Sequence, residues 1–310
     1  MVVDVVIVTY NRLEKLKKAL DSYENQTRSF RNLIVVNNHS TDGTSDYLDD
    51  WKSKPAQFAK YVINTQENLG GSGGYYLGQQ KAVELDAGWV FLADDDAYAE
   101  PHMMEEFWRY ASNHDISSLS AVCGTVFHPD GTIDLNHRSR FVRKGRRFVY
   151  RIPSRPEDYD NQEFEIDFLS YVGSFINVEA LRRIGLVEKN FFIYWDDSEH
   201  SMRLKKFGKI ICVPSIKIVH DDLVAGSSNV KAPIVSWKDY YLERNEMVFY
   251  KRHFPFVAIH KTRMLFLDKL KGKNRGNPYA KVIWQAVKDA WLGKMGKHKV
   301  YKPGWEIKEA

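Results

Sequence analysis

The chain has 310 residues, of which 44% are hydrophobic and 27% are charged, and its formal net charge is +5. A chain of this length can bury a core without disulfides, and this composition excludes disordered, collagen-like and small disulfide-scaffold proteins. The charge is uneven, because residues 251–310 hold 15 lysines and arginines against 4 acidic residues.

The two cysteines and the lengths of the apolar runs indicate the cellular compartment of the protein. Cys123 and Cys212 lie in apolar, strand-like runs and are expected to be buried free thiols, which indicates a reducing compartment. No basic segment precedes the first apolar run, and no run of roughly 18 apolar residues occurs, so neither a signal peptide nor a membrane span is expected. We therefore expect a cytoplasmic protein.

The first part of the chain alternates between strand and helix patterns. Residues 2–9 form a β-branched apolar run, typical of a strand covered on both faces, and Asn11 is expected to cap the next helix. Further strands are expected at 33–36, 61–63 and 89–93, and further helices from Thr44, over 72–85 and near 103–110. Such alternation predicts a parallel sheet that binds ligands at the carboxyl ends of its strands.

Longer strand-like pieces follow, at 119–127, 168–178 and 210–219. Between the first two, residues 141–151 read as a hairpin about Lys144-Gly145, and its basic residues have no acidic neighbour. It is either a solvated hairpin or a clamp for acceptor phosphates. The basic residues are Arg138, Arg140, Arg143, Lys144, Arg146, Arg147 and Arg151.

The C-terminal third reads as helical. Residues 279–291 place their apolar side chains on one helical face, and a similar stripe begins at Trp237. These helices either pack on the main domain or lie on a membrane surface. We therefore divide the chain into an α/β domain over 1–230 and a basic helical extension over 231–310.

Three consecutive carboxylates, Asp94, Asp95 and Asp96, directly follow the apolar run 89–93. Like charges this close raise one another's pKa unless something positive neutralises them. Hard oxygen ligands at a strand end suit Mg²⁺ or Mn²⁺, which also bind substrate phosphates. Alternation along an extended chain points Asp94 and Asp96 the same way and Asp95 the other way. A solvated acidic turn is the alternative.

A glycine-rich segment, NLGGSGG at 68–74, is expected to be a loop before the helix at 72–85. Its glycines let backbone N–H groups approach a phosphate or a sugar closely. Tyr76 stands where a GxGxxG motif would have its third glycine, which argues against a dinucleotide-binding dehydrogenase.

Three other polar segments are candidates for a site. The amides of Asn37 and Asn38 either belong to a helix cap or read the edge of a nucleobase. WDDSE at 195–199 opens a helix expected to run to Phe207; its carboxyls are either capping residues or include a general base. His220 follows a strand and is structural unless it shares a site with the carboxylates.

In order, TYNR at 9–12, NNHSTDGT at 37–44, NLGGSGG, ADDDA at 93–97, WDDSE and His220 resemble the family 2 inverting glycosyltransferases. The GGSGG segment, the Asp triplet and WDDSE resemble the galactofuranosyltransferase branch in particular. The resemblance covers residues 2–225. It implies an α/β fold of the GT-A type, a Rossmann-like mixed sheet flanked by helices, to which the basic helical C-terminal extension is attached.

The resemblance also implies roles for individual residues. Asp197 matches the catalytic base. The ligands of a divalent metal, Mn²⁺ or Mg²⁺, match Asp94, Asp96 and His220. Donor-nucleotide contacts match Thr9, Arg12 and Asn38. We further expect donor binding by Gly71, Gly73, Gly74, Asp94 and Asp95, and acceptor binding by Trp195, Asp196 and Glu199.

We therefore expect a metal-dependent inverting transferase that moves galactofuranose from UDP-galactofuranose to a hydroxyl of a lipid-linked bacterial glycan. Rhamnosyl transfer from dTDP-rhamnose is the close alternative. A nucleic-acid-binding protein would not need carboxylates at strand ends, and a non-catalytic glycan-binding module would not need a proton acceptor. We expect no nucleic-acid partner. The basic C-terminal helices are expected to attach the enzyme to the anionic inner face of the cell membrane.

Overall fold

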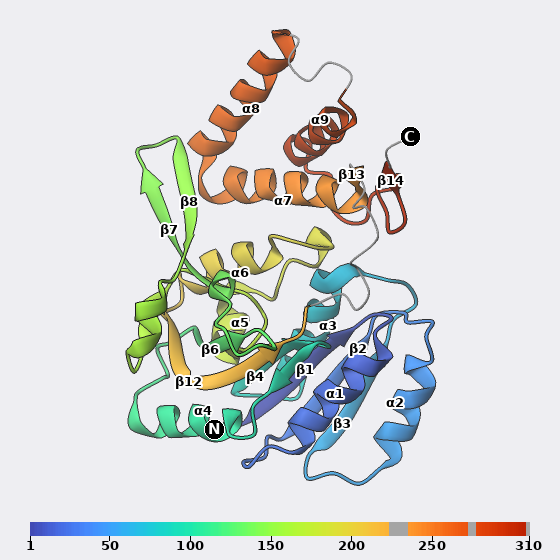
Figure 1. The fold of residues 1–310 in the computed structure, drawn as a ribbon, viewed down its shortest axis with the longest axis vertical. Coiled ribbons are helices and arrows are strands. Elements are labelled where there is room, and N and C mark those ends of the chain that lie inside the picture. The colour runs from blue at the N-terminus through green and yellow to red at the C-terminus, as the bar shows by residue number, and fades with distance from the viewer. Residues whose placement is uncertain (223–234, 272–276, 308–310) are drawn as a thin grey trace.

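A mixed nine-stranded sheet forms the centre of the protein, for which a computed structural model describes residues 1–222, 235–271 and 277–307 (Figure 1). The strands run in the order β3-β2-β1-β4-β11-β6-β12-β5, and β9 pairs with β12. Their bounds are β1 (Val3–Thr9), β2 (Asn32–Asn37), β3 (Ala59–Asn64), β4 (Trp89–Asp94), β5 (Ala97–Ala99), β6 (Ala121–Phe127), β9 (Phe164–Ile166), β11 (Ser174–Asn177) and β12 (Ile210–His220).

Strand direction explains where polar side chains gather. β1 is parallel to β2 and to β4, while β11 runs antiparallel to both β4 and β6, and β12 is parallel to β6. The carboxyl ends of β1, β2, β4 and β12 therefore lie at one edge of the sheet. That edge carries Thr9, Asn37, Asp94 and His220, the last residues of these strands.

Helices cover both faces of the sheet, because successive strand side chains point to opposite faces. Ile7 and its alternates pack with helices α1, α2 and α4, and Val8 and its alternates pack with α3, α5 and α6. The bounds are α1 (Leu13–Glu24), α2 (Thr44–Ser53), α3 (Gly70–Glu84), α4 (Met103–Asn113), α5 (Val178–Ile184) and α6 (Asp196–Leu204). The expected cysteine state is confirmed, since Cys123 and Cys212 are buried free thiols in this core.

Two predicted helix starts were wrong. Asn11 does not cap α1, which begins at Leu13; its side chain accepts the Thr41 N–H (2.7 Å), and Asp42 accepts the Leu13 N–H (3.0 Å). Helix α3 begins at Gly70, so the glycines lie inside its first turns and not in a preceding loop.

A β-hairpin leaves the sheet as predicted. β7 (Arg138–Lys144) pairs with β8 (Phe148–Pro153), and Lys144 lies opposite Phe148. The short strand β10 (Phe168–Leu169) extends it. Arg138 does not belong to its exposed basic face, because the side chain is buried and donates to the carbonyls of Gly124, Val172 and Gly173.

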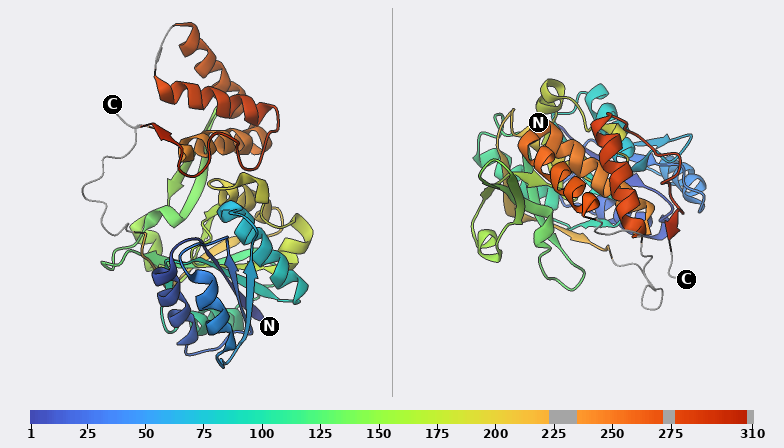
Figure 2. Two further views of the ribbon diagram at one scale, coloured as in Figure 1. Left: turned by 90° about the vertical axis from the view of Figure 1, so that its right-hand side faces the viewer. Right: turned by 90° about the horizontal axis from the view of Figure 1, so that it is seen from above.

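The C-terminal region forms a helical layer at one end of the molecule (Figure 2). It contains α7 (Trp237–His253), α8 (Pro255–Leu270), α9 (Pro278–Trp291) and the small ribbon of β13 (Val235–Ser236) with β14 (Glu306–Ile307). The helices share an apolar cluster with the segment that leads into α6, where Phe191 and Trp195 pack on α7. Within the described residues, every helix is too short or too polar to cross a bilayer.

Candidate active site

A cavity of about 520 Å³ lies at the carboxyl edge of the sheet. Segments from across the whole chain line it, including β1, the start of α3, the end of β4, the start of α6, the end of β12 and the start of α7. Of the residues predicted for a site, it brings together Thr9, Arg12, Asn38, Gly71, Asp94, Asp95, Asp96, Asp196, Asp197 and His220.

The Asp triplet divides into two sets of contacts. Ligand atoms of Asp94, Asp96 and His220 lie within 4.8 Å of one another. Asp95 is not part of this group; it accepts hydrogen bonds from the Thr9 hydroxyl (2.8 Å) and from Arg12 (3.3 Å), whose Nη1 also donates to Asp96 (2.5 Å). Burial raises the pKa of Asp95 to about 7 against the opposing charge of Arg12.

The group of Asp94, Asp96 and His220 fits a divalent cation. Burial and the neighbouring charge of Asp96 raise the pKa of Asp94. Burial also opposes ionisation of Asp96, yet His220 and Arg12 hold its pKa below the usual range. Asp96 Oδ1 is buried without a hydrogen bond among the described residues, although it lies 3.3 Å from His220 Nε2. Two carboxylates and one imidazole form a ligand set typical of Mn²⁺, and Asp96 Oδ1 is one of the atoms that could bind the ion.

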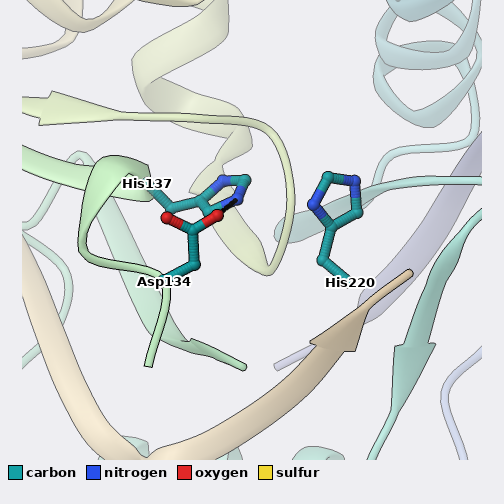
Figure 3. A group of neighbouring side chains, drawn as sticks. All are labelled: Asp134, His137 and His220. Atoms are coloured by element: carbon teal, nitrogen blue, oxygen red, sulfur yellow. Dashed lines mark ion pairs between the residues drawn. The ribbon is translucent and has the colours of Figure 1, made fainter. Parts of the chain in front are cut away.

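The other nitrogen of His220 faces a pair that the sequence analysis did not single out (Figure 3). His137 Nε2 lies 3.1 Å from Asp134 Oδ2, and His137 Nδ1 lies 2.6 Å from the Ser170 hydroxyl. Burial lowers the pKa of His137 to about 4, so the ring is neutral. His220 Nδ1 is buried and has no hydrogen-bond partner among the described residues.

The side-chain amides of Asn37 and Asn38 are occupied by hydrogen bonds within the protein, which differs from the alternative that they read the edge of a nucleobase. Asn38 donates to Gly70 O (3.0 Å) and Asn68 Oδ1 (3.2 Å), and it accepts from the Leu69 N–H (2.9 Å). Asn37 is equally engaged, with Asn64 and Ser40. Asn38 therefore holds the turn before α3 and shapes the cavity wall, whereas Asn37 ties the end of β2 to the end of β3 and to the turn before α2.

Only part of the glycine segment reaches the cavity. Gly71 lines it, and a Cβ there would meet no atom within 4 Å. Gly73 and Gly74 lie outside the lining; a Cβ on Gly74 would stand 2.4 Å from Val8 Cγ1, and one on Gly73 would stand 2.5 Å from Leu69 Cβ. These two glycines therefore allow close packing, chiefly of α3 on β1, rather than access for a ligand.

The acidic residues of α6 have separate environments. Asp197 lines the cavity, and its Oδ1 accepts hydrogen bonds from the Ser198 N–H (2.6 Å) and hydroxyl (3.2 Å). Burial raises its pKa to about 6, against the opposing charge of Arg151 at the base of the hairpin. Burial and Asp197 together raise the pKa of Asp196 to about 7.

Two residues expected to bind an acceptor lie outside the cavity. Glu199 is buried and pairs with Arg203 (2.8 Å), Arg252 (3.5 Å) and His253 (3.6 Å), so it ties α6 to α7. Burial opposes ionisation of the Glu199 carboxyl, but His253 and the two arginines lower its pKa to about 2. Trp195 packs on Phe249, with ring centroids 5.1 Å apart.

The segment that leads into α6 has a strained backbone. Phe192, Tyr194 and Trp195 all have positive φ angles between 66° and 70°, which costs free energy in non-glycine residues. The buried Asn245 of α7 holds this segment, because its Nδ2 lies 2.7–3.0 Å from the carbonyl oxygens of Phe191, Ile193 and Tyr194. Buried Arg244 donates to the Phe191 carbonyl as well (2.9 Å).

We predict that Asn245→Ala lowers both stability and turnover. The change leaves buried carbonyls unpaired at about 1–3 kcal/mol each, and it releases the segment that sets the direction of Asp197. Chemical unfolding and initial rates measure the two effects. The matched control is Asn25→Ala, because the exposed Asn25 side chain bonds only to Asp21. Equal stability and rates in the two variants would contradict this role for Asn245.

Residues from the C-terminal region also reach the cavity. Trp237, Lys238 and Pro303 belong to its lining, together with Tyr194 and Tyr171. No short motif marks them in the sequence, because only the packing of α7 against α6 brings them to the sheet edge. The C-terminal extension therefore completes the wall of the site.

Comparison with known proteins agrees with this geometry. Residues 4–185 match the family model described as glycosyl transferase family 2. Galactofuranosyltransferase GlfT1 of Mycobacterium tuberculosis is 29% identical over 205 residues, which cover 66% of this chain and 64% of GlfT1, somewhat less than two thirds of its length. The dTDP-rhamnosyl transferase RfbF of Shigella flexneri is 23% identical over 284 residues, which cover 86% of this chain and 89% of RfbF.

Solved structures show the same fold. The crystal structure of GalNAc-T7 with UDP, GalNAc and Mn²⁺ aligns with a TM-score of 0.63 at 14% identity, and it covers 94% of this chain and 56% of that one. The likeness identifies the mixed sheet with its flanking helices as a GT-A fold, as the sequence predicted.

Proposed function

Because this chain belongs to glycosyl transferase family 2, we propose that it is a metal-dependent inverting glycosyltransferase that transfers galactofuranose from UDP-galactofuranose to a glycan hydroxyl. One observation carries the proposal: the Asp94, Asp96 and His220 group and Asp197 line the same cavity at the carboxyl edge of the sheet. A metal-binding group for a diphosphate and a carboxylate for an acceptor hydroxyl are the two functions that such a transfer needs.

In the proposed reaction, Asp197 accepts the proton of the acceptor hydroxyl as its oxygen attacks the anomeric carbon. The bond between that carbon and the diphosphate oxygen breaks on the opposite face, so the configuration inverts. A divalent cation held by Asp94, Asp96 and His220 would supply Lewis-acid stabilisation of the departing diphosphate. The raised pKa of Asp197, about 6, suits a base that works near neutral pH.

We assign donor binding to the side of the cavity that holds β1 and α3. Thr9 and Arg12 are fixed by Asp95, Gly71 leaves open space, and Asn38 shapes the wall. We leave Gly73 and Gly74 out of this set, since their place is the contact with neighbouring side chains. Acceptor binding is assigned to Asp196, beside Asp197, and not to Trp195 or Glu199.

The galactofuranose donor rests on the similarity to GlfT1. The dTDP-rhamnose alternative has an observation in its favour, since the match to RfbF covers more of both chains. Thermal stabilisation across a panel of nucleotide sugars, with and without Mn²⁺, separates them. A ligand that binds only the folded state at about a hundred times its dissociation constant adds roughly 2.7 kcal/mol of stability. Stabilisation by UDP-galactofuranose that needs Mn²⁺ supports the proposal, and stabilisation by dTDP-rhamnose alone supports the rival.

We expect His220→Ala to weaken Mn²⁺ binding about tenfold or more, because His220 Nε2 faces the buried Asp96 oxygen. Calorimetric titration with Mn²⁺ measures the affinity. The control is His102→Ala, because His102 is solvent-exposed, pairs with Glu105 and does not line the cavity. Unchanged Mn²⁺ affinity in a folded His220→Ala protein would return His220 to a structural role.

The proposed acceptor is lipid-linked, and the proposed location is the inner face of the cell membrane. Residues 251–310 hold 15 basic against 4 acidic residues, and each Lys or Arg near an anionic bilayer contributes on the order of 1 kcal/mol. This excess is large enough for reversible attachment without a membrane-spanning segment.

A further inference from the structure

The β7–β8 hairpin and α8 lie side by side at the end of the molecule away from the sheet (Figure 1). Phe148 near the hairpin turn meets His260 of α8 edge to face, with ring centroids 5.1 Å apart. The guanidinium of Arg146 lies 5.9 Å from the ring of Phe256. Two elements more than a hundred residues apart in sequence therefore form one surface, here called the hairpin–α8 surface.

The hairpin contributes an apolar face that is about half exposed. Val142 pairs with Tyr150, and strand alternation places Phe148 and Ile152 on the same face as Tyr150. These four side chains are 44–49% exposed. The opposite face of the hairpin is anchored, because Val149 is buried and Phe141 packs on Phe249. The exposed face is thus held outward by the packing of the other one.

Helix α8 presents a stripe of the same kind. Phe256, Ile259, Phe266 and Leu270 follow helical spacing and are 51–67% exposed. The other side of the helix is fixed against α7 and α9, since Lys261 pairs with Glu246 and the Trp291 indole donates to Thr262 (2.9 Å). Packing therefore sets the rotation of α8 and leaves its apolar stripe exposed.

Positive charge surrounds these apolar side chains. The sequence has no acidic residue from 138 to 156, and Lys144, Arg146 and Arg147 at the hairpin turn are all exposed. Helix α8 adds exposed Arg263 and Lys269 and contains a single acidic residue, Asp268. Exposed apolar side chains rimmed by lysine and arginine are typical of proteins that lie in the interface of an anionic bilayer.

We infer that the hairpin–α8 surface inserts into the interface of an anionic lipid bilayer and presents the cavity to a lipid-linked acceptor. The inference rests on the proposed function and names the surface that serves it. The hairpin links the two places, because β7 begins at Arg138, directly after His137 of the cavity lining.

Flotation with vesicles tests the inference on the full chain. We expect binding to vesicles of phosphatidylglycerol and phosphatidylcholine at low salt, and weak binding to phosphatidylcholine alone. Arg146→Glu with Arg147→Glu should lower the partition coefficient at least about tenfold, and Phe266→Ser with Leu270→Ser should do the same. The matched controls are Lys18→Glu on α1 and Val300→Ser, which change an exposed cation and an exposed apolar side chain elsewhere. They should float like the unmodified protein.

Equal flotation of surface variants and controls would overturn the inference, as would an absence of flotation in the unmodified protein. Loss of self-association in the Phe266→Ser, Leu270→Ser protein with unchanged flotation would also overturn it and identify a second copy as the occupant. Stabilisation by nucleotide sugars with Mn²⁺ is measured on the same variants and should be unchanged. If the unmodified protein does not float but nucleotide sugars with Mn²⁺ still stabilise it, the proposed membrane surface is wrong and the proposed function stands. If the protein floats but nucleotide sugars with Mn²⁺ do not stabilise it, the proposed function is wrong.

Discussion

Asp197→Asn is expected to lower turnover by roughly two to four orders of magnitude while donor and metal binding persist. Asparagine keeps the shape and the acceptor oxygen that Ser198 contacts, but it cannot take a proton from the acceptor hydroxyl. Initial rates of UDP release in the presence of acceptor measure the effect. Because burial raises the pKa of Asp197 to about 6, the rate of the unmodified enzyme should rise as pH increases through about 6 and level off above it.

The controls for this prediction are its acidic neighbours. Asp196→Asn is expected to weaken acceptor binding but, at saturating acceptor, to keep far more turnover than Asp197→Asn, because it leaves the carboxylate of Asp197 in place. Glu199→Gln should lower the stability of the protein, since it weakens the pairs with Arg203, Arg252 and His253. Near-normal turnover in Asp197→Asn, with collapse in Asp196→Asn, would show that the neighbouring carboxylate is the base.

The second large effect is expected for Asp96→Asn, which should abolish measurable donor binding in Mn²⁺ together with turnover. The substitution removes a charge from the group that includes Asp94 and His220, and an amide is a much weaker ligand for a hard cation. Calorimetric titration with the donor, at fixed Mn²⁺, measures this.

Asp221→Asn is the matched control, because the Asp221 side chain contacts Lys15 and Tyr98 and does not line the cavity, while the bond of its backbone N–H to the Asp96 carbonyl (2.8 Å) is kept in the variant. It should bind donor and Mn²⁺ like the unmodified protein. Donor binding that survives Asp96→Asn would remove Asp96 from the metal group.

Several strand ends were predictable from the sequence, and with them much of the site, but the strand order, with antiparallel β11 between β4 and β6, was not. An apolar run in the sequence indicates a buried parallel strand, and a polar residue directly after such a run is expected at the carboxyl edge of the sheet. The resemblance to family 2 glycosyltransferases grouped Asp94 and Asp96 with His220, although 126 positions separate Asp94 from His220, and the structure brings their ligand atoms together.

Contacts between elements that are distant in sequence could not be predicted from the sequence. Glu199 looks like a site residue until α7 brings Arg252 and His253 to it. Asn38 looks free to bind a base until the turn before α3 occupies its amide. Asp134 and His137 carry a weak local signal, three residues apart in a 3-10 turn, but only the fold reveals that they face His220. In each case a partner remote in sequence decides what the side chain does.

Titration of Asp96→Asn and Asp197→Asn with UDP-galactofuranose in Mn²⁺, side by side in one calorimetric experiment, tests the division between metal group and base most directly. The structure separates the two carboxylates, since Asp96 is grouped with Asp94 and His220 while Asp197 is held by Ser198. We predict heat of binding for Asp197→Asn that matches the unmodified protein, and none for Asp96→Asn. Binding by Asp96→Asn together with loss of binding by Asp197→Asn would contradict this account of the site.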